Sequence, residues 1–109
     1  MWRPQTPPLQ KEDLADPLVA IHFWAVWNSY DRQMDKLLAE LQPEFEATLK
    51  FRSLDIDDPE SRPISVDAKI LNVPALGLFA NGQHVDTQIG LRDKEFWQNT
   101  LEEWSRFSK

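Results

Sequence analysis

The 109-residue sequence contains no cysteine. Thiol nucleophiles, disulfide exchange, iron–sulfur ligation by cysteine and cysteine–zinc sites are therefore excluded, because each of them requires a thiolate. On this ground we predict that the chain is not an enzyme, since without a thiol it has no thiol–disulfide oxidoreductase activity.

Glycine, basic runs and long apolar runs are also scarce. Three glycines are too few for a glycine-rich phosphate loop. A net charge of −6 without a basic run argues against nucleic acid as a partner. No apolar stretch is long enough to cross a bilayer and no signal peptide is evident, so we expect no membrane insertion and a cytoplasmic location. His22 and His84 are too far apart in sequence to suggest a metal site, and no cofactor is expected.

Large aromatic residues are abundant, with five tryptophans and six phenylalanines. They supply enough apolar area for one core, and the length suits a single domain over residues 1–109. Residues 1–8 hold three prolines, which favour extended backbone and allow at most an irregular edge strand.

The periodicity of apolar residues predicts an α/β fold. A continuous apolar run indicates a strand covered on both faces, and apolar residues at helical spacing indicate helices. The first predicted elements are a short helix over 9–16, a strand over 18–26, a helix interrupted or kinked at Pro43, and a strand over 49–57. A loop over 58–63, a short helix over 66–71, a hairpin of 75–80 and 83–89, and a last helix capped by Asp93 follow.

This order combines a βαβ crossover, which requires parallel strands, with an antiparallel hairpin. The expected architecture is therefore a mixed sheet between layers of helices.

Four separated motifs resemble the thioredoxin family between residues 18 and 104. They are the run Phe23–Trp27 at the end of a strand, Val73-Pro74 before a strand, the Asn81-Gly82 turn, and Gly90 before a capped helix. The resemblance implies a thioredoxin-like three-layer sandwich, in which helices flank a mixed sheet of four to five strands. It also implies a cis peptide bond at Val73-Pro74.

The chain departs from the family pattern at the residues that carry its chemistry. The two cysteine positions of the C-x-x-C motif fall on Asn28 and Asp31, and the buried aspartate of active members falls on His22. The resemblance thus implies the fold and a binding surface of a redox-inactive member. The simplest interpretation of Asn28 and Asp31 is helix capping, which is worth about 1 kcal/mol.

The rim that binds substrates in the family maps onto a candidate partner-binding surface. Its residues here are Trp27, Tyr30, Val73, Pro74 and Leu91. Exposed aromatic and aliphatic side chains of this kind are typical of a contact surface for a protein or an extended peptide. The alternative, which the sequence leaves open, is that Trp27 folds back and shields its own loop.

We therefore predict a non-catalytic protein-interaction module, acting as an adaptor, assembly factor or chaperone-like protein. One alternative is a small hydrolase or isomerase using Asp31, His22 and Ser29, which requires two of them to meet in an open pocket. Another is a substrate-holding partner of an active thiol–disulfide oxidoreductase. If the first hypothesis holds, packed side chains should separate His22 from the turn. Oligomeric state is left open.

Overall fold

The computed structural model describes residues 2–107, so residues 1, 108 and 109 of the expected domain lie outside it. Its strands are β1 (Val19–Trp24), β2 (Lys50–Asp55), β3 (Ala75–Ala80) and β4 (Gln83–Ile89). Its α-helices are α1 (Tyr30–Phe45), α2 (Arg62–Asp67) and α3 (Lys94–Ser105), and two short 3₁₀ helices are η1 (Lys11–Ala15) and η2 (Pro59–Ser61).

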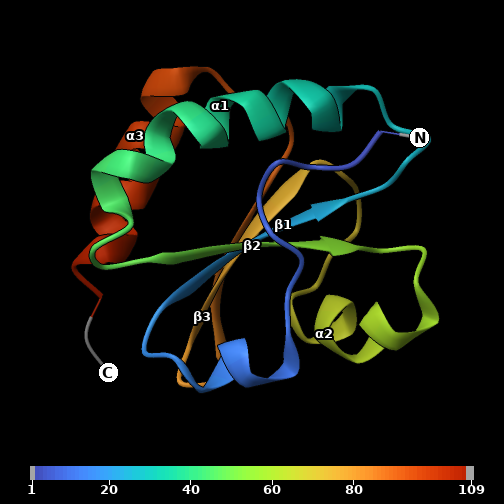
Figure 1. The fold of residues 1–109 in the computed structure, drawn as a ribbon, viewed down its shortest axis with the longest axis horizontal. Coiled ribbons are helices and arrows are strands. Elements are labelled where there is room, and N and C mark those ends of the chain that lie inside the picture. Colours follow the sequence, from blue (N-terminus) through green and yellow to red (C-terminus); the bar gives the residue numbers. More distant parts are fainter. Residues whose placement is uncertain (1, 108–109) are drawn as a thin grey trace.

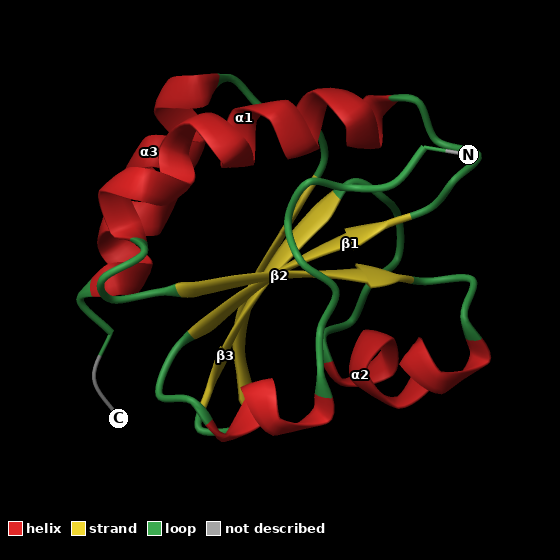
Figure 2. Ribbon diagram, viewed as in Figure 1, coloured by secondary structure: helices red, strands yellow, loops and turns green. Residues whose placement is uncertain are grey.

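The described elements form three layers, which confirms the predicted fold class. The sheet has the order β2-β1-β3-β4, with β1 and β2 parallel and the other neighbours antiparallel. Helices α1 and α3 cover one face of this sheet, while α2 and η1 lie on the other (Figures 1 and 2).

Strand β1 is the centre of the molecule, and every one of its residues is buried. Side chains alternate between the two faces of a strand. Ala20 accordingly joins the core under α1 and α3, whereas Ile21 and Phe23 join the core on the α2 side. The same alternation puts His22 on the α1 side, beside the start of that helix.

Strand β2 explains an irregularity in the predicted alternation. Its apolar residues change phase between Phe51 and Leu54, as the sequence shows. Phe51 packs in the core under α1 and α3, and Leu54 packs against the opposite core. Both phases are apolar because both faces of the strand are covered, and no bulge is needed.

Two predicted helices differ from the structure. Helix α2 begins at Arg62 and ends at Asp67, so the prediction of a helix over 66–71 is wrong. Pro63 lies in its first turn, where a missing N–H costs no hydrogen bond. The predicted interruption at Pro43 is also wrong, because α1 continues to Phe45 and places that proline in its last turn.

The N-terminal segment runs along the outer edge of β2. Pro8 forms an isolated parallel bridge with Ser53, and the Leu9 N–H donates to the Ser53 carbonyl at 2.8 Å. The segment is held to α1 as well, since the buried carboxylate of Asp35 accepts from the backbone N–H of Gln5 at 2.9 Å. The segment therefore acts as an irregular edge strand that covers the outer edge of β2.

A buried carboxylate joins η1 to β2. Asp13 accepts from Arg52 Nε at 2.9 Å, from Lys50 Nζ at 3.2 Å and from the Gln10 N–H at 2.7 Å. Burial alone would raise the pKa of Asp13, but the hydrogen bonds from the Gln10 N–H and from both cations outweigh it. They hold the pKa below its ordinary value of 3.8.

Asp13→Asn should lower the free energy of unfolding at neutral pH by about 1 to 2 kcal/mol, because charge-assisted hydrogen bonds are lost. Because the pKa of Asp13 is lower in the folded protein, the stabilisation is fully present at pH values above the pKa of the unfolded state, near 3.8. It disappears as the pH falls through the pKa of the folded state. Urea titrations from neutral to acidic pH should therefore show the variant and the wild type converging. Asp67→Asn, at an exposed carboxylate, is the control. A difference that is constant with pH would contradict this assignment.

Candidate functional site

The turn between β1 and α1 carries an exposed apolar patch. Val26, Trp27 and Tyr30 are 41%, 64% and 57% exposed, and we call these three side chains the aromatic face. The β1–α1 turn lies at the end of the molecule marked by the N-terminus (Figure 1). Val26 was not predicted as a site residue. The sequence placed it inside the buried strand predicted over 18–26, whereas β1 ends at Trp24.

Trp27 is fixed to a neighbouring loop without being covered. Its indole Nε1–H donates to Asp57 Oδ2 at 2.9 Å, across the loop that follows β2. The alternative in which Trp27 folds back over its own loop is not supported, since the ring is largely exposed and its bond reaches the loop after β2. A tethered aromatic ring loses little further conformational entropy when another molecule covers it.

Asn28 uses both ends of its side-chain amide. Its Oδ1 accepts from the Tyr30 N–H at 2.9 Å, and this satisfies one of the unpaired N–H groups at the start of α1. Its Nδ2 donates to the Val73 carbonyl at 2.7 Å. The expectation that the Asn28 oxygen accepts from an N–H at the start of α1 is thus confirmed, although the N-cap position itself is Ser29. The bond to Val73 adds a link to the loop before β3.

The loop before β3 presents backbone more than side chains. The Val73–Pro74 peptide bond is cis. Val73 is only 4% exposed, and Pro74 is buried as well. Leu91 is half-buried against the core beneath α1 and α3. Of the candidate partner-binding residues, only Trp27 and Tyr30 therefore offer largely exposed side chains.

Asp31 and His22 form a hydrogen-bonded pair inside the protein. Asp31 Oδ1 lies 3.2 Å from His22 Nε2, and Oδ2 accepts from the Ala25 N–H at 3.0 Å. Both side chains are fully buried. The expectation that packed side chains would separate His22 from the turn is wrong. Asp31 is also more than a surface charge at the helix start, because it ties the first turn of α1 to the end of β1.

The buried pair does not form an open catalytic site. Because a carboxylate oxygen only accepts, we assign the proton to His22 Nε2, and Nδ1 then has no partner within the described part of the chain. Ser29 is exposed, whereas His22 and Asp31 have no accessible surface. The hydrolase or isomerase hypothesis required an open pocket at these residues, and the geometry does not support it.

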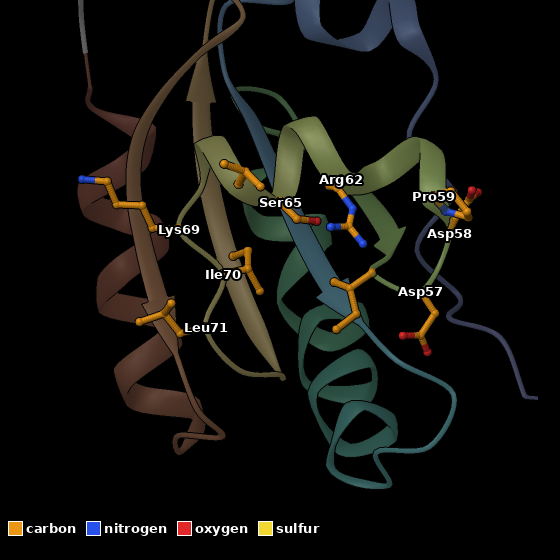
Figure 3. A pocket seen from close by; sticks show the side chains of 10 residues that line it. Asp57, Asp58, Pro59, Arg62, Ser65, Lys69, Ile70 and Leu71 are labelled. Carbon is orange, nitrogen blue, oxygen red and sulfur yellow. The ribbon is translucent and has the colours of Figure 1, made fainter.

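A pocket of about 570 Å³ adjoins the aromatic face. It lies between the loop after β2, helix α2 and the segment that leads to Val73 (Figure 3). Asp57, the acceptor for the Trp27 indole, is one of the residues that line this pocket, so it contacts both the pocket and the tryptophan. Val66 and Leu71, both well exposed, contribute apolar side chains to it.

Two further properties of residues 2–107 bear on the function classes considered. No group of three or more His, Asp or Glu side chains among these residues is placed to hold a metal ion. None of the helices over the same residues has both the length and the apolar composition needed to cross a membrane.

Asp31→Ala should lower the free energy of unfolding by about 3 kcal/mol, because the buried His22 N–H and the Ala25 N–H lose their acceptor. His22→Leu should cost a similar amount, because it leaves the buried Asp31 carboxylate with the Ala25 N–H as its remaining donor. A double-mutant cycle by chemical denaturation should show a coupling above about 1 kcal/mol. Additive effects would mean that the two side chains do not interact in solution.

Comparisons with known proteins agree with this fold. The family model described as Thioredoxin matches residues 8–103. The thioredoxin of Rickettsia bellii (strain RML369-C) is 32% identical over 90 residues, which cover 83% of this chain and 80% of that protein. The thioredoxin of Haemophilus influenzae (strain KW20) is 32% identical over 80 residues and 73% of each chain.

Solved structures are also similar. A mutant thioredoxin from Halobacterium salinarum NRC-1 has a TM-score of 0.76 and 20% identity, covering 98% of this chain and 95% of that one, which shows the fold alone. The Malassezia sympodialis thioredoxin has a TM-score of 0.74 and 25% identity, with 87% of this chain and 84% of that one covered.

These relatives correct one prediction. The statement that the chain is not an enzyme conflicts with them, because they are named thioredoxins and that family is one of oxidoreductases. The absence of cysteine concerns reactions that need a thiolate, and it carries no conclusion about enzymes in general. With a family model over residues 8–103 and several relatives above 30% identity, this chain belongs to the thioredoxin family.

Proposed function

We propose that this thioredoxin-family chain binds an extended segment of a partner protein at the aromatic face, as an adaptor, assembly factor or chaperone-like protein. The observation that carries the proposal is the clustering of Val26, Trp27 and Tyr30 as exposed side chains on one turn. Exposed apolar side chains that gather in this way mark contact surfaces, and tryptophan and tyrosine are the residues most enriched at binding hot spots.

The fixed position of the tryptophan supports the same proposal. Asp57 holds the indole N–H of Trp27, and the Asn28 amide holds the N–H of Tyr30. The Trp27 ring and the backbone from which the Tyr30 ring projects are therefore held before a partner arrives. Such preorganisation lowers the entropic cost of binding, which otherwise consumes much of the interaction free energy.

The adjoining pocket extends the surface beyond the two rings. A segment lying across Trp27 can place one apolar side chain between Val66 and Leu71, which are exposed and line the pocket. The volume of about 570 Å³ lies within the usual range for sites that receive small groups. The proposed partner is accordingly a flexible segment with apolar side chains and not a flat folded surface.

Trp27→Ala and Tyr30→Ala should each weaken binding roughly thirtyfold, because truncating an aromatic hot spot costs about 2 kcal/mol. Random twelve-residue peptides displayed on phage are selected against the wild type, and the affinities of the selected peptides are measured for each variant. Both residues are exposed, so the thermal midpoint should change little.

Phe107→Ala is the matched control. This aromatic residue is 37% exposed and follows the end of α3. Helix α3 lies on the opposite side of the molecule from the end marked by the N-terminus (Figure 1). Its removal should leave peptide affinity unchanged. Peptides that bind all three variants as tightly as the wild type, or a selection that yields no specific peptide, would contradict the proposal.

A further inference from the structure

We propose that Asn28 seals the backbone edge beside the aromatic face, so that a bound segment is recognised through its side chains and not by strand pairing. The inference rests on the proposed function, which it makes more specific. It assigns to Asn28 the role of a specificity-determining residue, in addition to its role as a helix cap.

The edge in question is the backbone of Val73. This residue lies two positions before the first residue of β3, and the next carbonyl along the chain, that of Pro74, is already paired with the Gly90 N–H at 2.8 Å. Unpaired backbone groups next to an exposed apolar patch are the usual template on which an extended segment adds as a strand. Val73 would be such a template if its own N–H and carbonyl were free.

Both polar groups of Val73 are occupied by asparagine side chains. Its carbonyl accepts from Asn28 Nδ2 at 2.7 Å, and its N–H donates to Asn72 Oδ1 at 2.9 Å. The orientation of the Asn28 amide is determined by its other bond, because Oδ1 must face the donating N–H of Tyr30. Turning the amide over would place an oxygen against the Val73 carbonyl and an amino group against an N–H.

Strand pairing at Val73 would therefore gain nothing. The Val73 N–H has one hydrogen and donates it to Asn72, so a segment can reach only the Val73 carbonyl. A segment N–H that took the place of Asn28 Nδ2 there would exchange one neutral hydrogen bond for another, and one that shared the oxygen would meet an acceptor already weakened by the bond from Asn28. The displaced amide would need a new acceptor next to the apolar segment, and an unsatisfied donor there is costly. Contacts with Val26, Trp27 and Tyr30 require no such exchange, because these side chains are exposed already.

The kind of partner follows from this arrangement. A segment that needs no backbone N–H can contain proline, or be methylated on its backbone nitrogens, without losing affinity. A segment that pairs as a strand cannot, because each ladder position requires its N–H.

A backbone N-methylation scan tests the inference. Peptides from the phage selection are synthesised with one N-methyl group at each position in turn, and their affinities are measured by calorimetry. The affinity of the wild type for each methylated peptide should stay within about threefold of that for the unmethylated peptide, because no peptide N–H bonds to the protein. Throughout the scan the side-chain NH₂ resonances of Asn28 should keep their positions in NMR spectra of the complex.

Asn28→Ser is the matched variant. A serine oxygen can still accept from the Tyr30 N–H as a cap, but it is too short to reach the Val73 carbonyl. With the carbonyl released, the unmethylated peptide should bind about fivefold more tightly, the value of one neutral hydrogen bond. One position of the peptide should then become sensitive to N-methylation. Asn28→Asp, which keeps the acceptor and lacks the donor, should behave in the same way and serves if the serine variant does not fold.

Two results would overturn the inference. One is a wild-type affinity that falls about tenfold or more on a single N-methylation, which would mean that the segment displaces Asn28 and pairs with Val73. The other is a serine and an aspartate variant that both bind as the wild type does and tolerate every methyl group. In either case the proposed function is kept if Trp27→Ala still weakens peptide binding. If Trp27→Ala leaves the peptide affinity unchanged, the proposed function is wrong as well.

Discussion

The buried carboxylate of Asp31 is the interaction on which the geometry of this site depends. It joins His22 in β1 and the Ala25 N–H just beyond that strand to the first turn of α1. Because both ends of the β1–α1 turn are held from inside, the residues between them have no core position to occupy. Trp27 and Tyr30 are consequently displayed on the surface, and Asn28 is placed where it reaches the loop before β3.

The turn is thus held by polar contacts on three sides. Asp31 fixes it to the strand, Asp57 fixes the indole of Trp27, and Asn28 fixes the turn to Val73. Each contact joins segments whose relative positions are set by the sheet, so the turn backbone and the Trp27 ring are held although the aromatic face is exposed. In the proposed binding mode, the specificity of the site lies in these side chains.

Most of the fold could be predicted from the sequence because both faces of the central strands are apolar. The run at 18–26 and the hairpin at 75–89 carry that signal directly. The start of helix α2 was predicted too late because Pro63, in its first turn, is a residue typical of loops. Its end was predicted too late because Lys69 has a left-handed backbone, with φ of 56°, and ends the turn that follows the helix. The favoured hypothesis separated His22 from the turn, and a contact with Asp31 was considered only under the hydrolase or isomerase alternative, because nothing in the spacing of two residues shows which face of a strand meets which turn of a helix. The burial of Val73 likewise depends on packing that no local pattern reports.

We expect a partner segment to lie on the aromatic face while Asn28 stays bonded to Val73. A crystal structure of the protein with a selected peptide would show whether it does. In that complex the peptide side chains should cover Trp27 and Tyr30, with the Asn28 Nδ2 to Val73 carbonyl distance still near 2.7 Å. A peptide bound along the open edge of β4, or one whose backbone has replaced Asn28 at Val73, would contradict it.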